Sequence, residues 1–113
     1  MEYLNRIELT GHVGEVNVRE VGKDCERVAH FQMCTCYKWW HKYEKHWVIE
    51  TEWHNVTAWE GQKGIDFKAI EKGKAIHVVG RLKMNRYVDG DNVEHVSYEV
   101  RASKVEEVKD EQD

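Results

Sequence analysis

The chain has 113 residues, of which 41% are hydrophobic and 34% charged, and its formal net charge is −4. This length supports one domain with a single core. Because the sequence contains no run of about 18 apolar residues, it predicts no transmembrane helix and no membrane partner. Residues 1–6 lack the cationic start and apolar stretch of a secretory signal. We therefore expect a cytoplasmic protein, whose three cysteines remain free thiols.

The negative charge is concentrated near the C-terminal end. Residues 105–113 contain five acids and one base, so the other 104 residues carry 16 acids and 16 bases. A neutral body can still bind an anion where its bases gather on one face. We expect a domain over residues 1–105, followed by a short acidic tail over residues 106–113.

Alternation of apolar and polar side chains predicts strands along most of the chain. The first strand starts near Asn5, and its apolar set switches from odd to even positions after Gly14, which indicates a bulge or sharp bend. A turn at residues 22–24 precedes the second strand. The expected inward set of that second strand is Ala29, Phe31, Met33 and Thr35.

Residues 38–46 are basic and aromatic and form a loop or an extended hairpin, and a third strand follows from about Trp47 to Trp59. Residues 61–73 are the only segment with helical spacing. A turn at residues 89–92 joins a fourth and a fifth strand into a hairpin. Their expected inward sets are Ile76, Val78, Leu82 and Met84, and Val96, Tyr98, Val100 and Ala102.

This order of elements predicts an all-β protein, a five-stranded OB-fold Greek-key barrel with one short helix between strands three and four. A first strand that bends at glycine supports this fold, because that strand must serve both sheets of the barrel. The OB-fold commonly binds oligonucleotides or oligosaccharides on the face of its second and third strands and in its loops.

Two tryptophans of the third strand are the main candidates for a binding face. Trp53 and Trp59 are six residues apart and therefore lie on the same face of a strand, together with Trp47 and Asn55. Polar neighbours make this face a poor core layer. Exposed rings on a polar face can stack bases, sugars or the side chains of a partner protein.

The outward face of the fourth strand adds Arg81, Lys83 and Tyr87. Further basic residues in the two neighbouring loops include Lys38, Lys42 and Arg86. Rings beside cations are typical of sequence-independent binding to single strands, in which each stacked base contributes roughly 1–3 kcal/mol. The alternative is that these strand tryptophans belong to the core and that the lysines and arginines are merely solvated.

Motifs for catalysis are lacking: the sequence has no glycine-rich phosphate loop and no nucleophile elbow, so we expect no enzyme. Cys34, Cys36 and His30 offer three metal ligands on one strand face, but a closed zinc site needs four. We therefore expect neither a metal site nor a cofactor.

Three segments resemble the bacterial single-stranded DNA-binding proteins of replication and repair, over roughly residues 4–105. Residues 51–56, Thr-Glu-Trp-His-Asn-Val, are similar to the most recognisable signature of that family. Residues 5–14 look like its opening strand with a Gly-x-x-Gly bend, and residues 72–82 look like its Lys-Gly…Val-x-Gly-x-Leu strand.

The resemblance implies that single-stranded DNA binds at four aromatic positions, which here are Trp39, Trp53, Trp59 and Tyr87. Trp39 enters on the resemblance alone, because uninterrupted alternation would place it inward with Phe31 and Met33. The resemblance also implies that His54 lies at a subunit interface of a homotetramer, although a dimer is possible.

Members of this family usually end in a long tail with a hydrophobic tip that recruits other replication proteins, and residues 108–113 lack such a tip. The resemblance therefore does not support recruitment by that route. The expected role is protection of single-stranded DNA in replication, recombination or repair, in the cytoplasm of a bacterium and associated with its nucleoid. The alternative is a protein-interaction module similar to primosomal replication protein N, a dimeric OB-fold.

Overall fold

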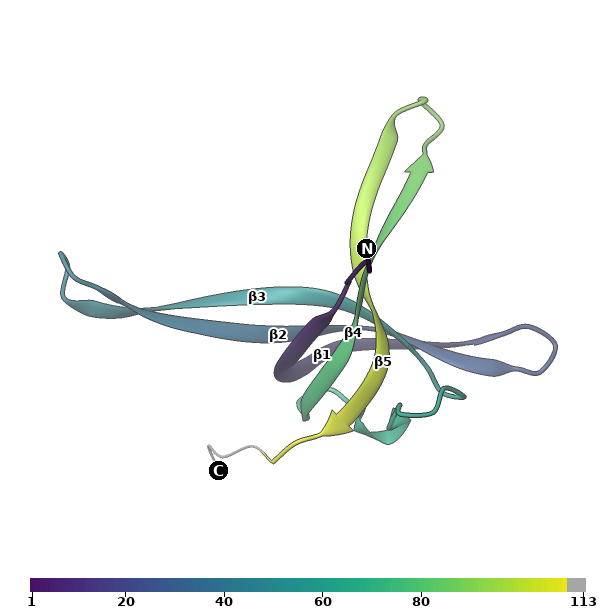
Figure 1. Ribbon diagram of the computed structural model, residues 1–113, viewed down its shortest axis with the longest axis horizontal. Coiled ribbons are helices and arrows are strands. Elements are labelled where there is room, and N and C mark those ends of the chain that lie inside the picture. The colour runs from purple at the N-terminus through teal and green to yellow at the C-terminus, as the bar shows by residue number, and fades with distance from the viewer. Residues whose placement is uncertain (110–113) are drawn as a thin grey trace.

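Five long strands form the protein, for which the computed structural model describes residues 1–109. Their bounds are Ile7–Val21 for β1, Glu26–His41 for β2, His46–Trp59 for β3, Ala75–Val88 for β4 and Glu94–Glu107 for β5. They form a closed barrel in the order β1-β2-β3-β5-β4 (Figure 1). This arrangement confirms the all-β OB-fold barrel.

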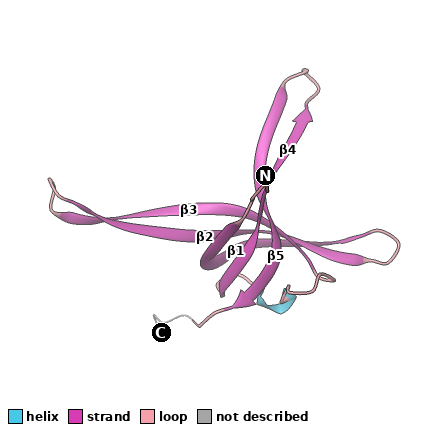
Figure 2. Cartoon of the chain, viewed as in Figure 1, coloured by secondary structure: helices cyan, strands magenta, loops and turns pink. Residues whose placement is uncertain are grey.

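The helical element between β3 and β4 is shorter than expected. Instead of a helix over residues 61–73, the structure has one 3-10 turn, η1 (Phe67–Ala69) (Figure 2). Gly64 and Gly73 adopt φ angles of 100° and 92°, which end helical geometry on both sides. Ile65 instead forms a parallel bridge with Val105, and Ile70 is buried in the core.

β1 bends because it serves two neighbours. Its first half pairs with β4 from Ile7↔Gly80 to His12↔Ala75, and its second half pairs with β2. The register with β2 shifts between Val13 and Val16, which confirms the bulge expected at Gly14. Gly11 lies where β1 crosses β2, and a side chain there would collide with the backbone carbonyl oxygen of Cys34.

The core consists of the inward residues of all five strands together with η1. Its fully buried side chains with the largest volumes include Met33, Ile76, Val56, Val78 and Val105. Most of the expected inward sets are confirmed, but four members are wrong: Leu82, Met84, Val96 and Tyr98, which are 40–54% exposed. β4 and β5 continue past the barrel as a two-stranded hairpin, so their inward-parity residues have no opposing sheet (Figure 1).

Three hairpins project from the barrel in different directions: β1–β2, β2–β3 and β4–β5 (Figure 1). The β2–β3 ladder is continuous from Val28↔Trp59 to His41↔His46, so residues 38–41 and 46 belong to an extended hairpin. None of the helices in the described part of the chain is long and apolar enough to cross a membrane.

The segment expected as an acidic tail begins inside β5, which extends to Glu107. The backbone N–H of Val108 donates to the carbonyl oxygen of Ala75 at 2.9 Å, so pairing with the start of β4 continues one residue beyond the strand. The rest of the expected tail, residues 110–113, lies outside the described residues.

The close crossing at Gly11 can be tested by Gly11→Ala. Because the new methyl group would force the backbones of β1 and β2 apart, we expect the free energy of unfolding to fall by about 1–3 kcal/mol. Urea denaturation measures this change. The matched control is Gly90→Ala, where an added methyl group meets no atom within 4 Å and should change stability by less than about 0.5 kcal/mol. Equal midpoints for both variants would contradict the crossing.

Candidate nucleic-acid interface

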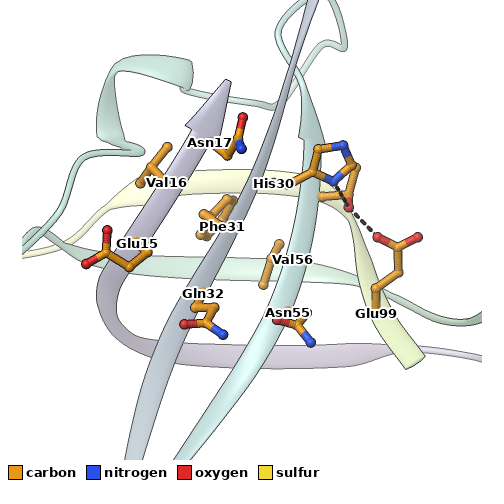
Figure 3. Close-up of a pocket in the computed structure, with 10 residues that line it drawn as sticks. Glu15, Val16, Asn17, His30, Phe31, Gln32, Asn55, Val56 and Glu99 are labelled. Carbon is orange, nitrogen blue, oxygen red and sulfur yellow. Dashed lines mark hydrogen bonds between the residues drawn. The ribbon is translucent and has the colours of Figure 1, made fainter. Parts of the chain in front are cut away.

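A chain of hydrogen bonds crosses the outer face of all five strands. Thr57 on β3 donates its hydroxyl hydrogen to Glu99 on β5, so its oxygen must accept from His30 Nδ1 on β2 at 3.1 Å. His30 Nε2 is then the acceptor for the guanidinium of Arg19 on β1, at 3.4 Å. From β4, the Asn85 amide donates to Glu99 at 3.1 Å. Figure 3 shows the links from His30 to Glu99.

The hydrogen bonds of this network converge on one acceptor, the carboxylate of Glu99. Arg101 Nε also donates to it, at 3.3 Å. Burial raises the pKa of Glu99, but the hydrogen bonds from Thr57, Asn85 and Arg101 outweigh burial and hold the pKa below its usual value. The carboxylate is therefore anionic at neutral pH, and the Arg101 guanidinium beside it offsets its charge.

Two open grooves lie on this outer face. The first, of about 470 Å³, includes the His30–Thr57–Glu99 contacts (Figure 3). Its polar lining consists of Glu15, Asn17, His30, Gln32, Asn55, Thr57 and Glu99. The second groove, of about 510 Å³, brings together Trp59, Arg81 and Arg101 beside the N-terminal segment 4–6. This second groove combines an aromatic ring, which can stack a base, with two cations, which can neutralise phosphate.

Trp53 lies on the outer face of the barrel and is 57% exposed. It pairs in register with Cys34 of β2, and its ring extends over Gly14 of β1. A side chain at position 14 would lie 2.6 Å from Trp53 Cζ3. Gly14, at which β1 bends, therefore also leaves the space in which the Trp53 ring packs against β1.

Tyr87 extends the same outer face onto the β4–β5 hairpin. Its ring stacks on His95 with centroids 4.8 Å apart and planes at 15°. His95 Nε2 lies 2.6 Å from the carboxylate of Asp89. Hydrogen bonds from His95, and then from the backbone N–H groups of Val93 and Asp91, lower the pKa of Asp89. These contacts hold one face of the Tyr87 ring and leave the ring exposed.

The expected cations occupy different positions. Arg81 and Lys83 share the outer face of β4 with Tyr87, and within residues 1–109 neither forms an ion pair. Arg86 has the opposite parity, and its guanidinium pairs with Glu94 at 3.5 Å. Lys42 lies in the β2–β3 turn with its ammonium group over the ring of Tyr43. Lys38 shares the outer parity of Trp53.

Trp39 and His54 lie on the face of the β2–β3 hairpin that is opposite to Trp53. β2 continues through Trp39 to His41 in unbroken register with β3, and the indole N–H donates to Glu50 at 3.1 Å. DNA contact by Trp39 therefore stays a prediction that rests on the resemblance. His54 is half-buried, with Nε2 2.9 Å from Thr35 Oγ1, and its expected role at a subunit interface likewise stays a prediction.

Two functional candidates, Arg101 and Trp40, were missed in the sequence, although alternation signals both of them. Arg101 precedes the inward Ala102 on β5 and so must face outward, next to Arg81. Because neighbouring residues of a strand point to opposite faces, a strand that turns Trp39 inward turns Trp40 outward. Trp40 indeed lies beside Trp47, on the same face of the β2–β3 hairpin as Trp53.

Within residues 1–109, no group of three or more histidine, cysteine, aspartate or glutamate side chains is arranged so that it could hold a metal ion. All three cysteines, Cys25, Cys34 and Cys36, are free thiols in the structure.

The seat of Trp53 can be tested by Gly14→Ala. Because the new methyl group would overlap the indole, the ring must move away from β1. In protein labelled with fluorotryptophan, fluorine NMR should show a shift of the Trp53 resonance, which Trp53→Phe identifies by its loss. The other four tryptophan resonances should change little, as should all five in Gly90→Ala. An unshifted Trp53 resonance would show that the ring does not rest on Gly14.

Comparison with curated proteins gives a consistent set of relatives. A single-stranded DNA-binding protein of Neisseria meningitidis is 26% identical over 102 residues, which cover 90% of this chain and 58% of that protein. The chain thus spans little more than half the length of this relative. Mitochondrial single-stranded DNA-binding proteins of Oryctolagus cuniculus and Danio rerio are 24% and 26% identical; the matches cover 90% of this chain and 73% and 74% of those proteins.

Solved structures confirm the fold. A structure titled as a Plasmodium falciparum SSB complex with ssDNA has a TM-score of 0.76 at 21% identity, covering 96% of this chain and 98% of that one. A small single-stranded DNA-binding protein from Streptomyces coelicolor has a TM-score of 0.67 at 19% identity, covering 96% of both chains. The model of the single-strand binding protein family matches residues 4–108. The chain therefore belongs to the single-strand binding protein family.

Proposed function

We propose that the protein binds single-stranded DNA without sequence preference, by stacking bases on exposed rings and neutralising phosphates with lysine and arginine. The observation that carries this proposal is the Trp53 ring, which lies exposed over Gly14 within the signature at residues 51–56. Membership of the family and the names of its relatives support the same ligand.

The proposed path runs along the outer face from Trp53 towards the second groove and the β4–β5 hairpin. A base that stacks on Trp59 would place its phosphate near Arg81 and Arg101, because these three residues line one groove. Lys83 and Tyr87 provide a further cation and ring on the same face of β4. Every base has an apolar face, so this arrangement needs no particular sequence.

Glu99 is compatible with an anionic ligand although it lies on this face. Its carboxylate accepts hydrogen bonds from Thr57, Asn85 and Arg101, and the last of these carries a compensating positive charge. A phosphate nearby therefore meets a paired carboxylate together with Arg81 and Lys83, which form no ion pair with any residue from 1 to 109. We infer that Glu99 organises the face and does not contact the ligand.

Several broader roles accompany this proposal. We propose that the chain acts in replication, recombination or repair in the bacterial cytoplasm, as a homotetramer in which His54 lies near a subunit contact. A non-catalytic role is consistent with the family, whose members bind DNA. The family match does not favour the alternative of a protein-interaction module similar to primosomal replication protein N. Such a module would show little tryptophan quenching by DNA.

Titration with poly(dT) tests the contribution of Trp53. We expect quenching of the intrinsic tryptophan fluorescence, and we expect Trp53→Ala to weaken binding by roughly 1–3 kcal/mol, the range for one stacked base. Trp53→Phe keeps a ring and should retain much of that affinity. Equal affinity for duplex and single-stranded DNA would contradict the proposal. If the folded Trp53→Ala variant binds like the parent, Trp53 is not a stacking residue.

Salt dependence tests the role of Lys83 separately. Because a phosphate contact acts through released counterions, Lys83→Ala should reduce the magnitude of the slope of log affinity against log salt by about 0.7. Maximal quenching should hardly change, since no ring is removed. Lys23→Ala, in the exposed β1–β2 turn, is the matched control and should leave the slope unchanged. Identical slopes for the two variants would remove Lys83 from the interface.

A further inference from the structure

The β2–β3 hairpin carries a pair of exposed rings in addition to Trp53. Trp40 and Trp47 face one another in register across the two strands, with ring centroids 5.4 Å apart and planes at 67°. They are 47% and 56% exposed. The ammonium group of Lys38 lies 4.6 Å from the centroid of the Trp47 ring. Two large indoles and a cation are thus left in solvent at one place.

This pair lies on the same face of the hairpin as Trp53. The β2–β3 register is continuous from Val28↔Trp59 to His41↔His46, so every second residue shares a face. Trp47 and Trp53 are six residues apart on β3, which places them roughly 20 Å apart at about 3.3 Å per residue. A single-stranded DNA that stacks on Trp53 can therefore reach the Trp40–Trp47 pair without leaving this face of the hairpin.

Charge differs between the two faces of the hairpin. The face of the tryptophans carries Lys38, which faces Ile49 in register. The opposite face carries Glu50 and Glu52, which face Tyr37 and Thr35. The tryptophan face therefore carries the more favourable charge for an anionic polymer.

We propose that Trp40, Trp47 and Lys38 form an additional stacking subsite, which extends the footprint of single-stranded DNA from Trp53 outward along the β2–β3 hairpin. This inference rests on the proposed function. Trp40 and Trp47 are not among the four aromatic positions that the family resemblance implies. An exposed cation–π contact is weaker than the stacking of a base, so a base displaces the Lys38 ammonium group, which then pairs with the adjacent phosphate.

The test compares two lengths of oligo(dT), one too short to span the roughly 20 Å between Trp53 and Trp47 and one long enough to cover both. Fluorescence anisotropy of labelled DNA measures the affinity of the parent and of the double variant Trp40→Ala/Trp47→Ala. We expect the double variant to bind the long oligomer roughly 5-fold or more weakly, the loss of at least one stacked base, and to bind the short one unchanged. Tyr37→Ala, on the opposite face of the hairpin, is the matched control and should bind both like the parent.

Each other outcome is informative. If the parent binds neither oligomer, the proposed function itself fails; if the parent binds and the folded double variant matches it on the long oligomer, only the subsite fails. Equal losses on both lengths, or a changed sedimentation coefficient without DNA, would instead assign the pair to folding or to contact between copies. Hydroxyl-radical oxidation of the parent supplies a readout without mutation: the long oligomer should protect Trp40 and Trp47 together with Trp53, and the short one should protect Trp53 but leave Trp40 and Trp47 reactive. Protection of Trp40 and Trp47 that does not depend on length would overturn the subsite.

Discussion

The barrel depends on a short seam between β3 and β5. These two strands pair in parallel through only Val56↔Val100 and Thr57↔Arg101, whereas the other neighbours share long antiparallel ladders. The hydrogen bond from Thr57 to Glu99 reinforces this seam, and the bond from Asn85 extends it to β4. Because donors from both sides meet on one carboxylate, Glu99 holds the β2–β3 and β4–β5 layers in a fixed relation.

That relation determines what the outer face can bind. With the seam closed, Trp59 of β3 lies in one groove with Arg81 of β4 and Arg101 of β5. Residues from three strands thus meet there only because the barrel is closed. On the other side of β3, the bend at Gly14 brings β1 beneath the ring of Trp53. β3 therefore presents two rings on its outer face: Trp53 packs against β1, and Trp59 lies beside Arg81 of β4 and Arg101 of β5.

Much of this architecture follows from alternation in the sequence. The switch of parity at Gly14 predicts the bulge, and parity places Trp53, Trp59 and Lys83 on the outer face. Parity gives the side of a strand but not whether another layer covers that side. Leu82 and Tyr98 have inward parity and are exposed, because β4 and β5 outrun the barrel.

Other features depend on long-range contacts that no local pattern encodes. Residues 61–73 have helical spacing, yet Ile65 pairs with Val105 and only a 3-10 turn forms. The chain of donors that ends on Glu99 joins residues up to 42 positions apart, as in Thr57 and Glu99. Parity predicts that these side chains face outward, but only the closed barrel brings them into contact.

The net charge of −4 does not oppose binding of an anion, because charge acts locally. Interactions between exposed charges fade beyond a screening length of about 8–10 Å in ordinary salt, so each surface is judged by its own neighbourhood. On the hairpin, Glu50 and Glu52 lie on the face opposite to Trp47 and Trp53. On the barrel, the one carboxylate at the seam is paired with Arg101, while Arg81 and Lys83 remain unpaired within residues 1–109. Glu50, Glu52 and Glu99 are thus either paired or turned away from Trp47, Trp53 and Trp59, and this sorting lets an acidic chain present a surface suited to DNA.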